Sequence, residues 1–232
     1  LQATLKKLGK PYADAIHHLS YGMVDLPSGK MKSREGTVVD ADELVKEVEE
    51  AAEAATLEKG KTEGLSDEEL AQLYHTLGLG ALKYYLLKVD PKKRMLFNPA
   101  ESVRLEGDTG PFIQYSYARI SKIRRDAEAS SVAAGADFSQ LGSLNPAEAD
   151  LIQQLAGYAG VVAEAARALS PAVVAQYAYE VAKTYNRFYT EVPILKETDA
   201  VKKAFRVALS AKTADTIKTS LGLLGIDVPE RM

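Results

Sequence analysis

Apolar residues recur at helical spacing along most of the chain. From residue 40 onward, Leu44, Val48 and Ala52 fall on one helical face, and acids occupy the first turn, where the helix dipole favours negative charge. A helix is therefore expected from residue 40. Residues 1–40 lack this sustained period, so the strand content of the chain is expected there.

The next helix has a clear start signal. Ser66 followed three residues later by Glu69 is a capping box, and it stands ahead of a further apolar stripe. This helix is expected to end near Gly78. A second apolar segment, residues 80–91, is then expected to be helical, with a strand as the alternative for residues 84–89.

The second half of the chain, residues 111–232, has the pattern of an all-α bundle. Turn residues precede a helix that is expected over residues 113–129. Three more helix starts carry a capping residue: Asn145–Pro146, Ser170–Pro171 and Thr198–Asp199. The last helix is expected to stop at Gly225. Residues 130–145 are small, polar and glycine-containing, and they are expected to form a mobile connector.

Composition limits the class of protein. The chain has 232 residues, 46% of them hydrophobic, which is enough for one large domain or two small ones. Cysteine is absent, which excludes disulfides, thiolate metal sites and a catalytic thiol, and no apolar run approaches the ~20 residues that cross a bilayer. We therefore expect a cytoplasmic protein with no membrane segment. Because Leu1 stands where an initiator methionine would, we also expect a fragment of a longer chain.

The net charge of -3 does not exclude a polyanionic partner, because nucleic-acid binding depends on where cations cluster. One cluster is the loop Pro27–Val39, PSGKMKSREGTVV, in which Lys30, Lys32 and Arg34 stand between two glycines. Glycines let backbone N–H groups approach an anion closely, so polyphosphate suits this loop. A solvated hairpin turn with its lysines in water is the alternative.

The surroundings of this loop resemble a known signature. Residues 17–47, HHLSYGMVDLPSGKMKSREGTVVDADELVKE, are similar to the KMSKS region of class I aminoacyl-tRNA synthetases, and above all to that of arginyl-tRNA synthetase. Residues 106–125, EGDTGPFIQYSYARISKIRR, resemble that family's entry into its helical anticodon-binding domain. The segments YNRFYTEVPIL and LGIDVPERM resemble its late helix and its C-terminus. The resemblance thus covers essentially the whole chain in the expected order.

This resemblance implies a fold and a function. The fold is mainly α, with a DALR-type anticodon-binding bundle over residues 111–232 and, over residues 1–110, the end of the α/β catalytic region with little strand. The parent enzyme would activate arginine with ATP and transfer it to tRNA(Arg). The implied partners are tRNA(Arg), and ATP with Mg²⁺ and arginine held through an N-terminal half outside this chain. We expect a monomer, no tightly bound cofactor and no membrane partner.

The resemblance also assigns the loop residues. The positions that would contact the ATP phosphates are Gly29, Lys30, Met31, Lys32, Ser33 and Arg34. In such enzymes, cations of this loop stabilise the charge that develops as the carboxylate of arginine attacks the α-phosphorus. The sequence departs from the pattern, since Ser33 stands where the second lysine of KMSKS belongs. Lys30 and Lys32 are the candidate catalytic cations, with a lysine outside this chain as the alternative.

A second signature of the family is absent from the sequence. No His-x-Gly-His element occurs, and the adjacent His17 and His18 match no such motif, so we interpret them as ordinary surface or partly buried histidines. The nucleotide pocket would then be incomplete. We expect this piece alone to lack aminoacylation activity, and we expect no metal site in it.

The helix expected over residues 113–129 has a basic flank. Its cations are Arg119, Lys122, Arg124 and Arg125, and its core-facing stripe would be Ile113, Tyr117, Ile120 and Ala127. No acid interrupts the segment from Gln114 to Arg125, which suits contacts with RNA phosphates. Arg119, Lys122 and Arg125 are therefore predicted to bind tRNA. A solvated helix face paired with Asp126 and Glu128 is the alternative.

The last aromatic cluster has two interpretations. A core-facing stripe would consist of Val174, Tyr177, Val181, Tyr185 and Phe188. The family uses aromatics of this helix against splayed anticodon bases, where stacking is worth ~1–3 kcal/mol per base. By position Tyr185 and Tyr189 are the candidates, although the stripe predicts that Tyr185 is buried. Met232 would join this tRNA-binding surface, as the family's terminal methionine does, or cap the bundle.

Two other classes of protein remain open at this point. One is a stand-alone helical RNA-binding module without catalysis, and the other is a protein-interaction bundle with no role in RNA binding.

Overall fold

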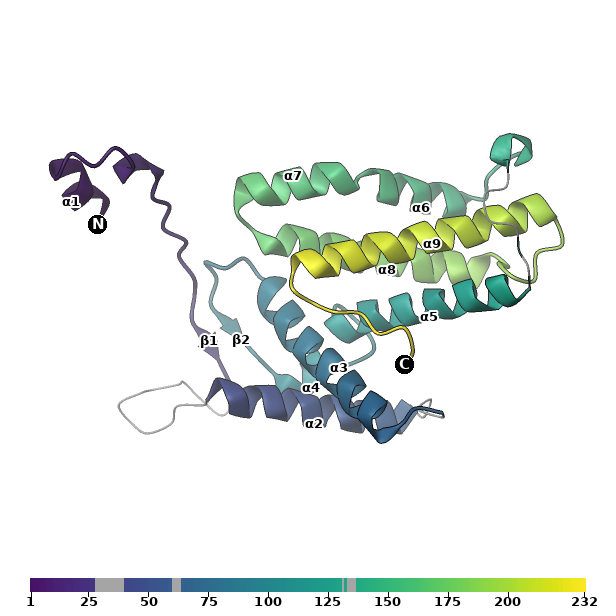
Figure 1. The fold of residues 1–232 in the computed structure, drawn as a ribbon, viewed down its shortest axis with the longest axis horizontal. Helices are drawn as coiled ribbons and strands as arrows, with labels where there is room; N and C mark the ends of the chain where they lie inside the picture. Colours follow the sequence, from purple (N-terminus) through teal and green to yellow (C-terminus); the bar gives the residue numbers. More distant parts are fainter. Residues whose placement is uncertain (28–39, 60–63, 131, 133–136) are drawn as a thin grey trace.

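The computed structural model describes residues 1–27, 40–59, 64–130, 132 and 137–232. These residues are mainly helical (Figure 1). In chain order the elements are α1 (Gln2–Lys7), the 3₁₀ turn η1 (Ala13–Ala15), β1 (Val24–Asp25), α2 (Ala41–Lys59), α3 (Asp67–Leu87), β2 (Met95–Leu96), α4 (Pro99–Ser102), α5 (Gly110–Ala129), η2 (Phe138–Gln140), α6 (Pro146–Ala156), α7 (Tyr158–Ala168), α8 (Pro171–Glu191) and α9 (Ala200–Leu223). The expected fold class, mainly α with little strand, is confirmed.

The two short strands pair in parallel, with Val24 opposite Met95 and Asp25 opposite Leu96. The strand in the first forty residues is thus confirmed, but the expectation that strand is confined to those residues is wrong, because β2 lies at Met95–Leu96. An ion pair ties the two strands together, because the Nη2 atom of Arg94 donates to Oδ1 of Asp25 over 2.9 Å. The strands lie beside the N-terminal end of α2 (Figure 1).

The helix that follows Ser66 differs from the prediction. Ser66 and Glu69 do form the capping box, but α3 continues without a break from Asp67 to Leu87 instead of ending near Gly78. The glycines serve close packing instead. A Cβ atom on Gly78 would lie 2.9 Å from backbone atoms of Glu49 in α2, and one on Gly80 would lie 2.4 Å from the side chain of Gln114 in α5.

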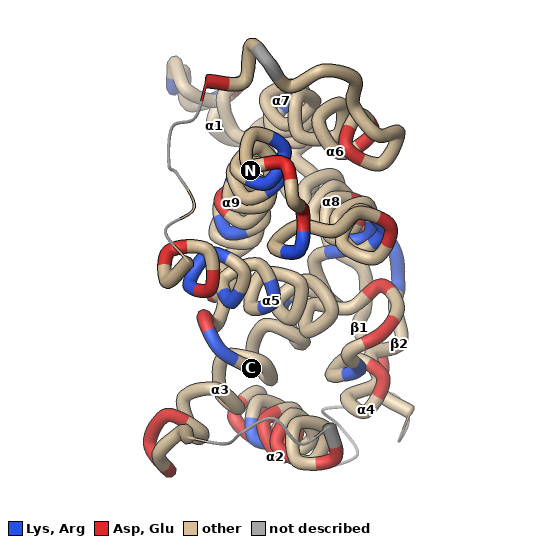
Figure 2. Tube along the Cα trace, turned by 90° about the vertical axis from the view of Figure 1, so that its right-hand side faces the viewer, with Lys and Arg blue, Asp and Glu red and all other residues tan. Residues whose placement is uncertain are grey.

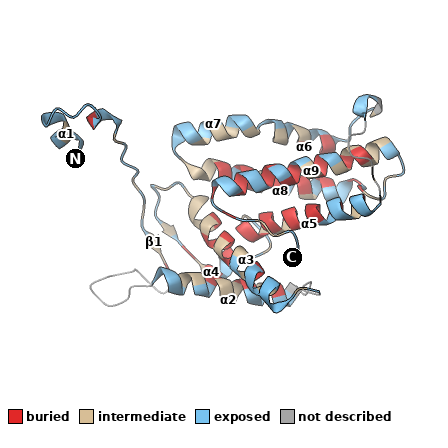
Figure 3. Cartoon of the chain, viewed as in Figure 1, coloured by how far each residue is buried: buried red, intermediate tan, exposed pale blue. Residues whose placement is uncertain are grey.

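The C-terminal bundle packs α5, α6, α8 and α9 around one core, and α7 lies along α8 (Figure 1). The buried residues follow the facing sides of these helices (Figure 3). Both predicted stripes are confirmed, since these residues are at most 6% exposed: Ile113, Tyr117, Ile120, Ala127, Val174, Tyr177, Val181, Tyr185 and Phe188. The all-α bundle predicted for the second half of the chain is therefore present.

The predicted helix ends agree with the structure in most cases. Asn145 forms a capping box with Glu148, and Asp199 accepts hydrogen bonds from the first turn of α9. The helix α8 begins at Pro171 as expected, but the side chain of Ser170 makes no capping hydrogen bond. After α9, Gly225 has a φ of +67°, a left-handed conformation that favours glycine and ends the helix.

A buried ion network joins α6 to α9. Arg206 of α9 is 7% exposed, and its Nε atom donates to Oε1 of Glu148 over 2.7 Å. Its Nη1 atom donates to the carbonyl of Pro193 and to Glu197. None of the helices in the described ranges is long and apolar enough to span a membrane.

Candidate nucleic-acid interface

The predicted phosphate loop lies outside the described residues, including Gly29, Lys30, Met31, Lys32, Ser33 and Arg34. The elements on both sides of it are described. Leu26, just before the loop, packs in one small core with Val48 of α2, Leu82 and Phe97. The two chain segments that lead into and out of the loop are therefore anchored to the same core.

The predicted basic helix, α5, holds Arg119 in a fixed position. The Cζ atom of Arg119 lies 4.8 Å from the ring centroid of Tyr115 and 4.8 Å from that of Tyr189. Its Nη1 atom also donates to the side-chain oxygen of Asn186 on α8, and the amide nitrogen of Asn186 donates to Ser116 over 2.8 Å. A guanidinium between two aromatic rings gains cation–π energy from both of them.

Two adjoining pockets, each of about 490 Å³, meet at Arg119. Both are lined by Tyr115, Arg119 and Met232. The first continues past Asn186 to Phe112, Leu105, Glu106 and Thr56. The second continues past Tyr189 to Lys122, Arg125 and Arg231. We call these two pockets together the α5 groove.

The other cations of α5 have carboxylate neighbours. The Nζ atom of Lys122 lies 2.6 Å from Oδ2 of Asp126, and Nη1 of Arg124 lies 3.5 Å from Oδ1 of Asp215. Nη1 of Arg125 donates to the carbonyl of Glu230 over 3.1 Å and lies 3.8 Å from its carboxylate. The pairing of Lys122 with Asp126, which the alternative of a solvated helix face named, is therefore present, and both side chains are exposed.

Two cations along the α5 groove make no ion pair with a carboxylate of the described residues: Arg119 and Arg231. Figure 2 shows cationic segments along α5 and at the end of the chain, and many acidic segments on α2. Hydrogen bonds from Ser66 and, to a smaller extent, the charge of Arg231 lower the pKa of Glu69, so Arg231 is partly compensated. Arg119 is the remaining groove cation that makes no ion pair with a carboxylate of the described residues. Such a site suits an anion with a planar group that can stack, such as a nucleotide.

The aromatic candidates separate into one exposed and one buried side chain. Tyr189 is 43% exposed, whereas Tyr185 is fully buried and donates from its hydroxyl to Oγ of Ser210 over 3.2 Å. Burial raises the pKa of the Tyr185 hydroxyl. Because its ring cannot reach a base without leaving the core, we correct the stacking assignment of Tyr185. The centroid of its ring lies 6.5 Å from that of the Tyr189 ring, so the two rings are neighbours.

Met232, which was predicted to join a tRNA-binding surface or to cap the bundle, lies between a small core and the α5 groove. Its side chain is partly buried against a second small core that includes Ala52, Leu73 and Leu77. It also lines both pockets of the α5 groove. Met232 therefore caps the packing between α2 and α3 and at the same time forms a wall of the groove.

Among the groove residues that sequence reasoning missed are Tyr115, Asn186 and Arg231. Tyr115 stands four residues before Arg119, and Asn186 three before Tyr189, so each lies one helical turn from a predicted contact. This helical spacing could have indicated from the sequence that Tyr115 and Asn186 lie beside the predicted contacts. Arg231 had no comparable signal, because its place depends on how the C-terminal tail folds back.

Comparison with known families gives two matches that together span most of the chain. Residues 113–232 match the family described as DALR anticodon binding domain, and residues 1–98 match the family described as tRNA synthetases class I (R), catalytic domain. The chain therefore belongs to the class I aminoacyl-tRNA synthetases with a DALR anticodon-binding domain.

Individual relatives narrow this class. The chain is 57% identical over 228 residues to the arginine–tRNA ligase of Flavobacterium psychrophilum, which covers 98% of this chain and 37% of the relative. It is 52% identical over 233 residues to that of Amoebophilus asiaticus, covering 100% of this chain and 39% of the relative. Within the class, the sequence thus corresponds to the C-terminal portion of arginyl-tRNA synthetase, and it spans well under half the length of these relatives.

Solved structures agree with this assignment. The Thermus thermophilus arginyl-tRNA synthetase matches with a TM-score of 0.86 and 31% identity, over 100% of this chain and 38% of that one. The arginyl-tRNA synthetase of Plasmodium falciparum matches with a TM-score of 0.72 over 93% of this chain and 35% of that one. At 22% identity, the second comparison supports the fold alone.

Proposed function

We propose that this chain is the tRNA-binding and loop-bearing part of an enzyme that activates arginine with ATP and transfers it to tRNA(Arg). Residues 111–232 bind the anticodon region of the tRNA, and residues 1–110 complete the catalytic region. Lys30 and Lys32 stabilise the charge on the ATP phosphates, with Mg²⁺-bound ATP as the substrate. The parent enzyme works as a cytoplasmic monomer, and the 232-residue piece alone has no aminoacylation activity.

The α5 groove is the proposed site for anticodon bases. Arg119, Tyr189 and Met232, all predicted from the sequence, line it together with Tyr115 and Asn186. The exposed ring of Tyr189 offers a stacking surface, and the Asn186 amide orients the guanidinium of Arg119. Lys122 and Arg125 contribute charge at the rim, where partners such as Asp126 are exposed and give way to phosphates at little cost.

The observation that carries this proposal is the placement of Arg119 between Tyr115 and Tyr189 with no ion-pair partner among the described carboxylates. Holding a guanidinium in this way loses side-chain entropy before any ligand binds. An unpaired, pre-oriented cation between aromatic faces suits single-stranded RNA, whose bases stack on rings and whose phosphates need cations.

A tRNA(Arg) transcript titrated at several salt concentrations tests the proposal. Tyr189→Ala should weaken binding by roughly 5- to 140-fold, the equivalent of ~1–3 kcal/mol of lost stacking. Arg119→Met should also weaken tRNA binding. It should reduce the slope of log affinity against log salt concentration by ~0.7–0.9, the contribution of one neutralised phosphate. Arg167→Met on the exposed end of α7 is the matched control and should change neither quantity.

Unchanged affinity in both groove variants would refute anticodon binding at this site. A salt-independent affinity in the unmodified chain would favour the protein-interaction bundle instead. The match of residues 1–98 to a catalytic-domain family weighs against a stand-alone RNA-binding module.

The loop needs a separate experiment in the longer parent enzyme. Lys30→Ala and Lys32→Ala should each slow adenylate formation by orders of magnitude while leaving the unfolding midpoint unchanged, because the cations act on the transition state. Rates equal to those of the unmodified parent would refute the assigned role of the loop.

A further inference from the structure

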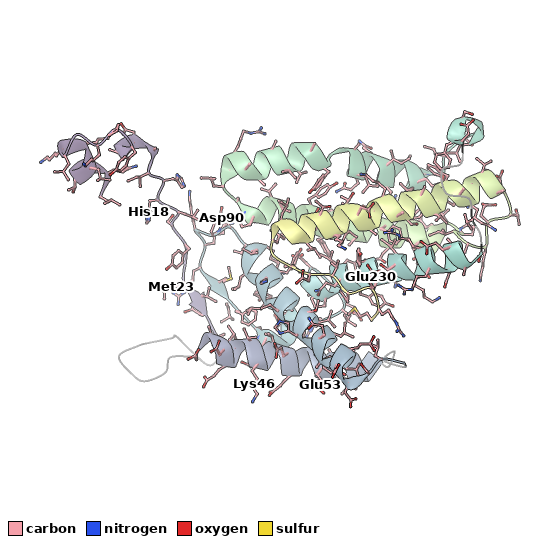
Figure 4. The ribbon with its side chains drawn as sticks, in the orientation of Figure 1. His18, Met23, Lys46, Glu53, Asp90 and Glu230 are labelled. Atoms are coloured by element: carbon pink, nitrogen blue, oxygen red, sulfur yellow. The ribbon has the colours of Figure 1, made fainter. Side chains whose placement is uncertain are left out.

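After Gly225 the chain turns back and crosses the bundle. Residues 226–232, which we call the C-terminal strap, leave α9, pass over α3 and end beside α5 (Figures 1 and 4). Ile226 and Val228 pack against the core of the bundle, and side-chain hydrogen bonds from α5 hold the strap at Asp227 and Glu230. Where it ends is important because its last two residues, Arg231 and Met232, line the α5 groove.

One face of α5 supplies these hydrogen bonds. Tyr117 follows Gln114 by three residues, and Arg125 follows Tyr117 by eight. At 100° per residue, these spacings place the three side chains on one side of the helix. The hydroxyl of Tyr117 donates to Oε1 of Glu230 over 2.8 Å, and Arg125 donates to the carbonyl of the same residue. Tyr115, Arg119 and Lys122 lie on the adjacent face and line the groove, and Arg125 belongs to both sets, so one helix both holds the strap and lines the groove.

Gln114 is the most deeply buried of these contacts. It is 0% exposed, and its Nε2 atom donates to the carbonyl of Thr76 in α3 over 3.0 Å and to that of Asp227 in the strap over 2.8 Å. The space it occupies depends on Gly80, where a Cβ atom would lie 2.4 Å from this nitrogen. A single amide group thus joins α3, α5 and the strap. Leaving such a buried carbonyl without a donor is costly.

We propose that Gln114, assisted by Tyr117, is a positioning residue for RNA binding: it fixes the strap so that Arg231 and Met232 line the α5 groove together with Arg119. The inference rests on the proposed function of that groove. Gln114 itself touches no ligand, because it is enclosed on all sides. Its effect on binding passes through the last two residues of the strap.

The test combines Gln114→Met with removal of residues 231–232. Methionine keeps the length and apolar stem of glutamine but cannot donate a hydrogen bond. Amide exchange of the strap should rise at least tenfold in Gln114→Met, and tRNA(Arg) affinity should fall. In the chain that lacks residues 231–232, the same substitution should leave affinity unchanged, because the wall through which it acts is gone. Gln153→Met on the exposed face of α6 is the matched control.

Each failure has its own signature. Unchanged strap exchange in Gln114→Met, or an equal loss of affinity with and without residues 231–232, would overturn the positioning role. Unchanged affinity in Arg119→Met and Tyr189→Ala would instead overturn the proposed function of the groove. If Gln114→Met does not fold, Tyr117→Phe replaces it, because this change removes only the hydroxyl bonded to Glu230. Strap exchange should again rise, and tRNA affinity should fall only in the chain that retains residues 231–232.

Discussion

The crossing of α2 and α3 at Gly78 leaves no room for a methyl group. A Cβ atom built there would lie 2.9 Å from three backbone atoms, Cα and N of Glu49 and the carbonyl oxygen of Val48. Backbone atoms cannot rotate away as a side chain can, so Gly78→Ala must push the two helices apart. The apolar residues beside the crossing, among them Leu77, would lose contact with α2.

The size of the effect follows from a comparison with Gly160. Gly160 lies inside α7, where a Cβ atom would meet nothing within 4 Å. Gly160→Ala should therefore stabilise the fold by ~1 kcal/mol, the ordinary advantage of alanine over glycine in a helix. Gly78→Ala has the same advantage, but it is set against ~1–3 kcal/mol of overpacking. The difference between the two variants isolates the cost of the crossing, and it should be at least ~1 kcal/mol.

Urea unfolding followed by circular dichroism measures this difference. The midpoint should rise in Gly160→Ala and fall or stay level in Gly78→Ala, with similar slopes against urea in both. Equal rises of the two midpoints would show that α2 and α3 do not approach as closely at Gly78 as the structure has them.

Two further predictions concern buried or titrating charges. Arg206→Met should lower the free energy of unfolding by ~3–5 kcal/mol because Glu148 is left buried without its cation, and Glu148→Met in the same chain should recover part of the loss; equal losses in the single and double variants would contradict this. Burial alone would raise the pKa of Glu230, but the hydrogen bond from Tyr117 and nearby cations outweigh it and lower the pKa from its ordinary 4.5. Because the folded-state pKa is the lower one, the stabilisation from Glu230 is present at neutral pH and is lost as pH falls through that pKa. The difference in urea midpoint between the unmodified chain and Glu230→Gln should therefore shrink below about pH 4.5, and a difference that is constant with pH would refute it.

The features that could be predicted from the sequence are those decided within one helix turn. The capping boxes at Ser66 and Asn145 depend on residues three positions apart, and both occur in the structure. The buried stripe that contains Tyr185 follows from helical period alone, and this stripe is also what removes Tyr185 from the groove. Local patterns thus gave the helices and their inner faces.

The features that could not be predicted depend on which segments meet. A glycine such as Gly78 gives the same local signal whether it ends a helix or admits a neighbouring helix, and the choice depends on α2. The strand Met95–Leu96 has two residues, and its pairing is with a segment some seventy residues earlier. The contact between Arg125 and Glu230 spans 105 positions, so the sequence offered Arg125 as a free cation when it also holds the strap.

The cations of α5 can now be separated by what their surroundings allow them to do. Lys122 is an exposed cation beside Asp126, and exposed pairs of this kind contribute little and exchange partners readily. Arg119 is held by an amide and two rings and makes no ion pair with a carboxylate of the described residues, so its charge remains available to a ligand while its geometry is already set. A planar guanidinium that is fixed in this way can discriminate between ligands by their shape as well as by their charge. Under the proposed function, Arg119 is therefore expected to contribute both to specificity and to the salt-dependent part of the affinity, whereas Lys122 and Arg125 contribute to the salt-dependent part alone.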